Sequence, residues 1–249
     1  MPLPVVSVIP LEGLPELEPE DDLGLLLHGA ATAVGGLADG DVVVVAQKAV
    51  SKVEGRVVSI DGVEPSGRAV ALAGPDGDPR HVEVILRESA EVVRSRPPLV
   101  IAETRHGFVC ASAGVDASNT PGDDVLVLLP LDPDESARRL RVRLRQLSGT
   151  DVGVIVSDSF GRAWRQGTTD VALGVAGIAP LRDLRGTSDA RGRELKTTQI
   201  AVADELAGAA ELVMGKSRGV PAAIVRGVDV RGDGSASELV MPRERDLFR

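Results

Sequence analysis

An apolar run from Val152 to Val156 stops abruptly at the polar pair Ser157-Asp158. A short continuous apolar run of this kind predicts a buried strand. The residues that follow, up to 170, are rich in glycine, threonine and arginine and include the only tryptophan, Trp164. In α/β proteins, ligands bind beyond the carboxyl ends of such strands, so we expect Asp158 to open a polar, ligand-binding loop. The alternative for this loop is a solvated turn with ordinary surface charges.

The periodicity of apolar residues predicts strands and helices along the whole chain. We expect strands at residues 5–9, 42–46, 55–60, 99–103, 107–111, 125–129, 171–175 and 221–225, and helices at 22–34, 78–94, 132–147 and 198–214. The strand–helix–strand unit from 125 to 156 has the length of a right-handed parallel crossover. Residues 61–78 are rich in Gly, Pro and Asp and predict a long loop, or a sub-domain boundary within one domain of residues 1–249. An irregular tail is expected from about residue 227.

Composition excludes several classes of protein. The net charge of −9 at pH 7 argues against binding of long nucleic acid through its phosphates. Aromatic residues make up 2% of the chain, so base-stacking surfaces are almost absent. The single cysteine, Cys110, excludes an internal disulfide and a cysteine zinc site. The chain shows neither a secretion signal nor an apolar run of about 18 residues, so we expect a cytoplasmic protein without membrane contact.

Common nucleotide-binding and hydrolase motifs are missing. Residues 214–217 (MGKS) are similar to the end of a Walker A loop, but residue 210 is alanine and a helix is expected before them. No G-x-G-x-x-G follows an expected strand, and no G-x-S-x-G nucleophile elbow is present. The histidines at positions 28, 81 and 106 lack the spacing of zinc ligands, so each is expected to be structural or solvated and not catalytic.

What remains is a set of carboxylates at strand ends or in glycine-flanked loops, Asp116, Asp158 and Asp170. Oxygen ligands without His or Cys suit hard cations such as Mg²⁺ or Mn²⁺, which complete their shells with water and nucleotide phosphates. Arg162 and Arg165 follow Asp158 closely and are predicted to stabilise a phosphate or acyl phosphate. Lysines at positions 48, 52 and 216 either meet phosphate or are solvated. These residues predict a metal-dependent enzyme that handles phosphate, without identifying its substrate.

Several segments resemble motifs of the coenzyme F420-0:L-glutamate ligase family, in the family's order. They are residues 13–16 (GLPE), 47–56 (QKAVSKVEGR), 113–119 (AGVDASN), 157–167 (SDSFGRAWRQG), 169–172 (TDVA) and 213–216 (VMGK). The similarity covers nearly the whole chain. It implies an α/β (mixed α+β) fold with mixed sheets flanked by helices, unlike P-loop and Rossmann folds, and an intertwined homodimer.

The resemblance implies a GTP-dependent ligase that joins an acid to an amino acid. GTP would phosphorylate the free carboxylate of coenzyme F420-0. The amine of L-glutamate would then displace phosphate from this acyl phosphate and form an amide, and later cycles would add further γ-linked glutamates. The implied cofactors are a pair of divalent ions, Mg²⁺ or Mn²⁺, with K⁺ as a further candidate. The partners would be F420-0, L-glutamate and GTP, with no nucleic acid and no membrane.

The resemblance also implies the positions of site residues. Asp116 and Asp158 match ligands of the first divalent ion, and Ser159 matches a position at the second. The positions expected to contact GTP are Leu14, Pro15, Glu16, Leu17, Gln47, Lys52, Asn119, Met214, Gly215 and Lys216. Archaeal relatives tend to have Ser or Thr at position 47, and Thr is common at 159, so this chain departs from the family pattern at both. Arg162 and Arg165 are assigned from the chemistry of their loop, not from the family.

Two other functions fit these residues. The chain could be a non-catalytic nucleotide-binding scaffold that has kept the fold; loss of Asp116 or Asp158 would have favoured this, and both are present. It could also join an amino acid to a different acidic acceptor. In some actinobacterial relatives a flavin-binding domain follows this one, so the chain is either a stand-alone ligase or part of a longer protein.

Overall fold

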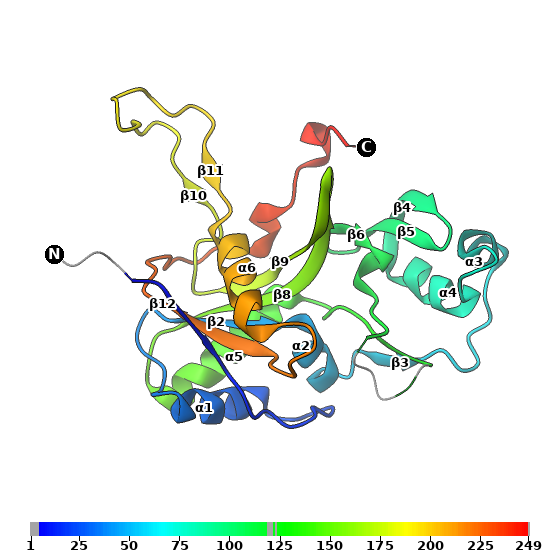
Figure 1. Ribbon diagram of the computed structural model, residues 1–249, viewed down its shortest axis with the longest axis horizontal. Coiled ribbons are helices and arrows are strands. Elements are labelled where there is room, and N and C mark those ends of the chain that lie inside the picture. The colour runs from blue at the N-terminus through cyan, green and yellow to red at the C-terminus, as the bar shows by residue number, and fades with distance from the viewer. Residues whose placement is uncertain (1–4, 119–121, 123, 249) are drawn as a thin grey trace.

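Two parallel strands, β2 (Val42–Ala46) and β8 (Gly153–Arg162), form the centre of a mixed sheet (Figure 1). A computed structural model describes residues 5–118, 122 and 124–248. Within these residues the sheet has the order β1-β12-β2-β8-β9, completed by β1 (Ser7–Pro10), β12 (Ala222–Arg226) and β9 (Arg165–Ala176). The other neighbouring pairs in this sheet are antiparallel. The prediction of an α/β fold with mixed sheets is confirmed.

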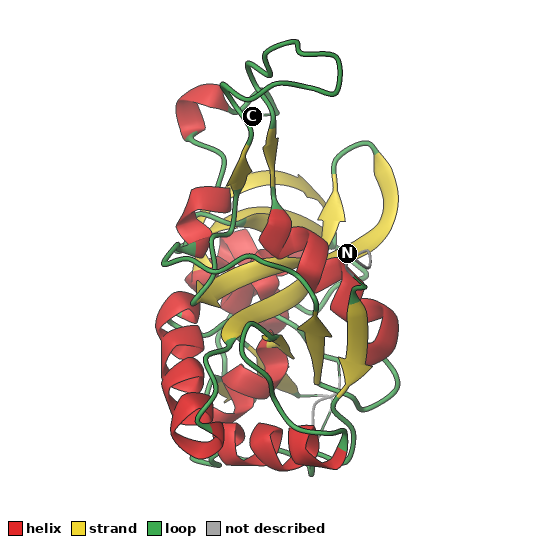
Figure 2. Ribbon diagram, turned by 90° about the vertical axis from the view of Figure 1, so that its left-hand side faces the viewer, coloured by secondary structure: helices red, strands yellow, loops and turns green. Residues whose placement is uncertain are grey.

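Helices on both faces of the sheet explain the apolar run of β2 (Figure 2). Val43 and Val45 face one side and belong to the same core as α1 (Leu23–Ala33) and α5 (Pro133–Ser148). Val42 and Val44 face the other side and share a core with α6 (Val202–Met214). All of these valine side chains are at most 1% exposed. Because burial of one valine stabilises a fold by about 1.5–3 kcal/mol, this short strand supports both halves of the core.

A separate core lies in what we call the small lobe, the described residues between 57 and 128. It contains the antiparallel pair β3 (Val57–Ser59) and β7 (Val125–Val127), and the antiparallel strands β4 (Ser89–Arg96), β5 (Leu99–Thr104) and β6 (Val109–Ala111). Two helices, α3 (Gly67–Ala73) and α4 (Pro79–Glu88), share a core with these strands around Ile85, Val100 and Leu126. Figure 1 shows the small lobe beside the central sheet, with β6 next to β8.

Two expectations for the small lobe are wrong. The helix expected to reach residue 94 ends at Glu88, because Ser89 adopts extended backbone and its Oγ donates a hydrogen bond to the Ile85 carbonyl at 2.6 Å. Residues 89–96 form β4, in which Val92 pairs with Ala102 of β5. Residues 61–78, expected to be a loop, contain α3, whose N-cap Ser66 accepts a hydrogen bond from the Ala69 amide.

The parallel crossover expected between residues 125 and 156 is also wrong. β7 pairs with β3 in the small lobe, whereas β8 pairs with β2 in the central sheet. The length of a strand–helix–strand unit permits a crossover but does not decide which strand each strand pairs with. The helix between them, α5, packs closely on β9 at Gly174, where a Cβ would lie 2.1 Å from the Pro133 carbonyl oxygen.

The polar loop expected after Asp158 is a long β-hairpin. β8 continues past Asp158, turns at Trp164 and returns as β9, with Ser159 directly opposite Asp170. β2 ends opposite Ser157, so the hairpin extends beyond its central neighbour as an arm (Figure 1). Trp164 at the tip is 88% exposed, has a φ of 60° and contacts the ring of Phe248. Asp158 therefore lies within a strand and not at its end.

Shorter elements complete the described chain. α2 (Gln47–Val53) begins immediately after β2 and was not predicted from the sequence. The strands β10 (Arg182–Asp183) and β11 (Gln199–Ile200) form the base of a projecting segment (Figure 1), so the helix predicted from residue 198 begins only at Val202. The tail after β12 contains short 3₁₀ helices at Ala236–Leu239 and Arg243–Arg245. Among the described residues, no helix combines the length and the apolar character needed to cross a bilayer.

Candidate active site

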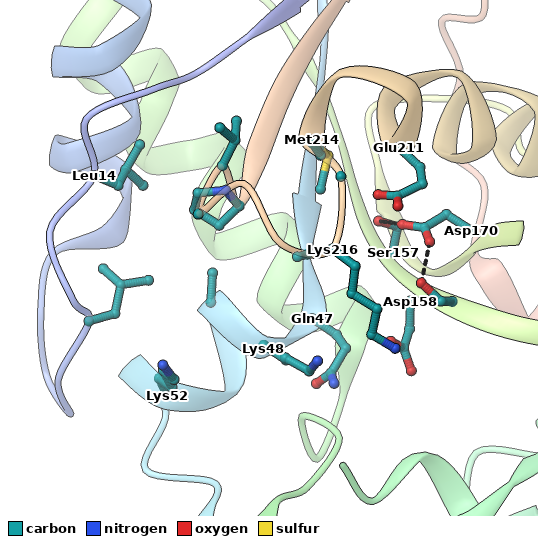
Figure 3. A pocket seen from close by; sticks show the side chains of 18 of the residues that line it. Leu14, Gln47, Lys48, Lys52, Ser157, Asp158, Asp170, Glu211, Met214 and Lys216 are labelled. Atoms are coloured by element: carbon teal, nitrogen blue, oxygen red, sulfur yellow. Dashed lines mark hydrogen bonds between the residues drawn. The ribbon is translucent and has the colours of Figure 1, made fainter. Parts of the chain in front are cut away.

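A pocket of about 450 Å³ opens where β2 ends and α2 begins (Figure 3). Its walls come from segments far apart in the sequence: residues 14–17, 46–49 and 52, 157–159, 170, 211, 214–217 and 219–221. Cavities of this size accommodate nucleotide-sized ligands. The first turn of α2 forms one wall, the strands β8 and β9 a second, and the end of α6 a third. The sequence predicted most of these segments as ligand-binding, but not that they share one cavity.

Gln47 is positioned in this pocket by the direct transition from β2 to α2. Its side chain is 1% exposed, and its Oε1 accepts a hydrogen bond from Ser51 Oγ at 2.9 Å. Its Nε2 is buried and has no hydrogen-bond partner among the described residues. Buried donors are nearly always paired, so an unpaired amide in a pocket wall is typical of a group that donates to a bound ligand. Gln47 is thus suited to the ligand contact predicted for it.

Lys48 and Asp116 connect α2 to the small lobe. The Lys48 ammonium lies 2.7 Å from Asp116 Oδ2 and 2.7 Å from Ser118 Oγ, while the Ser118 amide donates to Asp116 Oδ1 at 2.6 Å. The backbone of Asp116 is fixed by two hydrogen bonds with Val127 of β7. Burial alone would raise the pKa of Asp116, but the hydrogen bonds from Lys48 and Ser118 outweigh it, so the pKa is lowered. Asp116 is held ionised.

Asp158 shows the opposite shift. Burial raises its pKa to about 7, and the negative charges of Asp116 and Asp170 contribute to the rise, against the positive charge of Lys48 and a hydrogen bond from the Ser159 amide. Asp158 is therefore close enough to both carboxylates for their charges to repel its own. A raised pKa caused by burial and by neighbouring carboxylates marks a place where a bound cation would be favourable.

The carboxylates Asp116 and Asp158 fit a divalent ion of the hard type. Within the residues the structure describes, no group of three or more His, Cys, Asp or Glu side chains is arranged to hold a metal. Mg²⁺ needs no such group, because it is commonly bound through one or two carboxylates with water and phosphate completing its shell. In this structure, Asp116 is paired with the ammonium of Lys48 at 2.7 Å. The donor set thus suits Mg²⁺ or Mn²⁺ bound together with a phosphate.

Ser159 lies beside a second acidic group. Asp170 is 5% exposed and accepts hydrogen bonds from Ser157 Oγ at 3.0 Å and from Ser159 Oγ at 2.7 Å. Glu211, on the last turns of α6, faces Asp170 in Figure 3, and burial together with the charge of Asp170 raises the pKa of Glu211. Sequence analysis missed Glu211. The available signal was its position on the predicted helix, three residues before Met214 in the motif VMGK.

The mouth of the pocket is formed by the loop before α1 and by the loop after α6. Lys52 forms an ion pair with Glu16 across this mouth. Met214 ends α6, and Gly215 follows it with a φ of 60°, a conformation that favours glycine. Lys216 reaches from this loop into the pocket toward Asp158 (Figure 3). Leu14, Pro15 and Leu17 complete the wall on the α1 side, so the structure brings together nearly all of the positions predicted to contact GTP.

Not every predicted site residue lines the pocket: Asp116 does not, although it pairs with Lys48, which does. Arg162 and Arg165 are exposed at the far end of the β8–β9 hairpin and do not line the pocket; the Arg162 guanidinium lies 3.4 Å from the Gln166 carbonyl oxygen. Asn119 falls outside the described residues. Cys110 is 6% exposed in β6, as expected for a small core residue, and burial raises the pKa of its thiol to about 12.

Comparison with known proteins shows what the chain resembles. Residues 13–227 match the model of a family described as F420-0:Gamma-glutamyl ligase. The chain is 46% identical to the coenzyme F420:L-glutamate ligase of Methanothermobacter thermautotrophicus, across 98% of this chain and 99% of that protein. It is 47% identical to the protein of the same name from Methanopyrus kandleri, across 99% of both. The protein of that name from Methanocaldococcus jannaschii is 47% identical over 86% of each chain.

Proposed function

The chain belongs to the F420-0:gamma-glutamyl ligase family, and on that basis we propose that it is a ligase that joins L-glutamate to coenzyme F420-0 through an amide bond. The proposal is supported by curated relatives that are similar over almost their whole length and carry the name coenzyme F420:L-glutamate ligase. The observation that carries it is the pocket at the end of β2. It combines the carboxylates Asp158 and Asp170 with an unpaired buried amide and three lysines, one of which pairs with Asp116, and this set suits a ligand with phosphates and a divalent ion.

The proposed nucleotide is GTP, which activates the acceptor as an acyl phosphate. The carboxylate oxygen of F420-0 attacks the γ-phosphorus, the bond from that phosphorus to the β-phosphate oxygen breaks, and GDP leaves. The free amine of L-glutamate then attacks the acyl carbon and expels inorganic phosphate, with loss of one proton from nitrogen. Gln47 and Lys52 would bind the nucleotide, while Lys216 would meet its phosphates.

Asp116 and Asp158 would hold a divalent ion that binds the nucleotide phosphates and neutralises the charge that develops on the transferred group. A second ion would lie near Ser159, where Asp170 and Glu211 also supply carboxylates. The neighbouring side chains contribute by holding one of these carboxylates in a fixed position. Asp170 is fixed by the hydroxyls of Ser157 and Ser159, so its oxygens need no rearrangement when a ligand binds.

The test is mass spectrometry of F420-0 incubated with the protein, L-glutamate and Mg²⁺ or Mn²⁺, with GTP and ATP in parallel. The expected product is heavier by one glutamate residue and appears with an equal amount of GDP. Equal activity with ATP would refute the nucleotide assignment. Activity with another acidic acceptor but not with F420-0 would favour the different-acceptor function. No product with either nucleotide would favour the scaffold.

We also propose that the protein is a homodimer. Several large apolar side chains of the described chain are exposed at the hairpin tip and the tail, among them Trp164 at 88% and Phe248 at 60%. Light scattering at micromolar concentration is expected to give about twice the chain mass of 25.9 kDa. A monomer at all concentrations would exclude any contribution of a second subunit to the pocket.

A further inference from the structure

Lys48 is paired with Asp116, the carboxylate proposed above to bind a divalent ion. Its ammonium is 2.7 Å from Asp116 Oδ2, and the two side chains are only 17% and 23% exposed. We propose that Lys48 is a resident counter-ion: it holds the Asp116 carboxylate while the site contains no metal, is displaced from it by the divalent ion, and then pairs with a phosphate of the nucleotide. This inference rests on the proposed function, because it takes Asp116 as a metal ligand and a nucleotide as the occupant of the pocket.

The geometry makes the two cations competitors. Asp116 Oδ1 already accepts a hydrogen bond from the Ser118 amide at 2.6 Å, and Oδ2 accepts from Lys48. A divalent ion and an ammonium cannot both lie within about 3 Å of one carboxylate oxygen without strong repulsion. Binding of the ion therefore breaks the pair. The ammonium can move, since it is a compact charge on a flexible four-carbon stem, whereas the backbone of Lys48 is fixed in the first turn of α2.

A nucleotide offers the displaced ammonium a new partner. Lys48 also lines the pocket, together with Lys52 and Lys216, so its ammonium can turn from Asp116 toward a ligand bound there. With the pocket empty of phosphate, the anionic group whose charge Lys48 also meets is Asp158, and that carboxylate is the other proposed metal ligand. With phosphate bound, the ammonium gains an anionic partner and releases Asp116. The divalent ion and the nucleotide are thus coupled through Lys48, in addition to the direct bond between the ion and the phosphate. Binding of either one lowers the free-energy cost of binding the other.

The test is a Mn²⁺ titration of the full chain, in which electron paramagnetic resonance counts the free ion. Without nucleotide, Lys48→Met is expected to bind Mn²⁺ about tenfold more tightly than the wild type, the order of effect of one hydrogen bond to a charged group. The matched control is Lys52→Met, which removes the same charge from the same helix but contacts Glu16 and not Asp116. It is expected to change the Mn²⁺ affinity less than threefold. A non-hydrolysable GTP analogue should tighten Mn²⁺ binding more in the wild type than in Lys48→Met.

Several results would overturn the inference. Mn²⁺ binding by Lys48→Met that is equal to or weaker than that of the wild type would do so, as would a tightening that persists in the Asp116→Asn background, where no competition remains. Circular dichroism checks that the variants fold, and Lys48→Gln, which also removes the charge, replaces Lys48→Met if that protein does not fold. The titration requires no turnover. A chain without ligase activity can still show the competition, and an active ligase without the effect refutes only the role of Lys48.

Discussion

The central sheet and the small lobe each supply one of the two carboxylates proposed to hold the first divalent ion, and the pKa values of these two carboxylates are shifted in opposite directions. Asp116, from the small lobe, has a lowered pKa because the hydrogen bonds from Lys48 and Ser118 outweigh its burial. Asp158, from the sheet, has a pKa raised to about 7 because it is buried and faces other carboxylates. The small lobe thus brings a carboxylate that is already neutralised, whereas the sheet brings one that remains unfavourable until a cation binds.

The largest effect is expected for Asp158→Asn, which removes the unfavourable carboxylate and keeps its size. Turnover should fall at least about a hundredfold, the size of loss seen when one electrostatic group is removed from an active site. The melting temperature of the metal-free protein at pH 8 should stay the same or rise, since a buried charge near other carboxylates is lost. Full activity would remove Asp158 from the site. A large drop in melting temperature would contradict the inference that the ionised Asp158 carboxylate destabilises the metal-free fold.

Asp116→Asn should reduce turnover by a similar factor but also destabilise the fold. The variant leaves Lys48 without its carboxylate in a half-buried site, and loss of a hydrogen bond to a charged group costs about 1.5–3 kcal/mol. Urea unfolding of the metal-free protein measures this loss, with Asp158→Asn as the matched control. Equal stability of the two variants would mean that pairing with Lys48 does not stabilise Asp116 in the metal-free protein.

The pH dependence of the free energy of unfolding should distinguish the two carboxylates without any measurement of activity. The folded pKa of Asp158, about 7, lies above its ordinary value of 3.8, so the folded state binds the proton more tightly. Stability from this group is therefore present below pH 4 and is lost as pH rises through 7. Asp116 has a lowered folded pKa, so its contribution is present above pH 4 and is lost as pH falls below that value.

The measurement is urea unfolding in the presence of a chelator, from pH 3 to pH 8, for the wild type and both asparagine variants. We expect the decline between pH 4 and pH 7 to be weaker in Asp158→Asn, and the acid-side loss to be weaker in Asp116→Asn. The same decline in the wild type and in Asp158→Asn would show that another group causes it.

The smallest effect is expected at the hairpin tip. Arg162 and Arg165 are exposed and lie outside the pocket, so Arg162→Ala and Arg165→Ala should each change turnover less than about fivefold and stability by less than about 0.5 kcal/mol. Steady-state kinetics with saturating substrates measures this. A loss of a hundredfold would extend the catalytic region to the tip and support the phosphate-binding role predicted for these arginines from the sequence.

Local patterns in the sequence were sufficient to predict most of the central sheet. The strand at Val42–Ala46 is confirmed, and the helix predicted at residues 198–214 is confirmed from Val202 onward; the strand buries apolar residues on both of its faces and the helix along one face. The segment after Glu88 could not be predicted in this way. The residue types at 89–96 are compatible with a helix or a strand. Pairing with β5, which is a tertiary contact, stabilises the strand.

The site residues likewise divide into those that a local sequence pattern predicts and those that depend on tertiary contacts. Asp116 and Asp158 were chosen because each lies next to small residues near the end of an apolar run, and the structure places them within reach of each other's charge. The lowered pKa of Asp116 depends on Lys48 from a third segment, and the raised pKa of Asp158 depends on burial and on carboxylates from other segments, so no local pattern contains either shift. Glu211 was missed for a related reason: on a helix it resembles an ordinary surface carboxylate until Asp170 is known to face it.

The direct passage from β2 into α2 determines which parts of the pocket can move. The residue at the junction, Ala46, donates its amide to the Pro221 carbonyl at 2.8 Å, and the strand behind it is wholly buried. A displacement of the backbone at Gln47 or Lys48 would have to shift the middle of the sheet, which is closely packed. The wall that carries these residues is therefore rigid, and opening or closing for substrate and product falls to the loops on the opposite side, residues 13–17 and 215–220. Their exchange rate, not that of α2, would set any conformational limit on turnover.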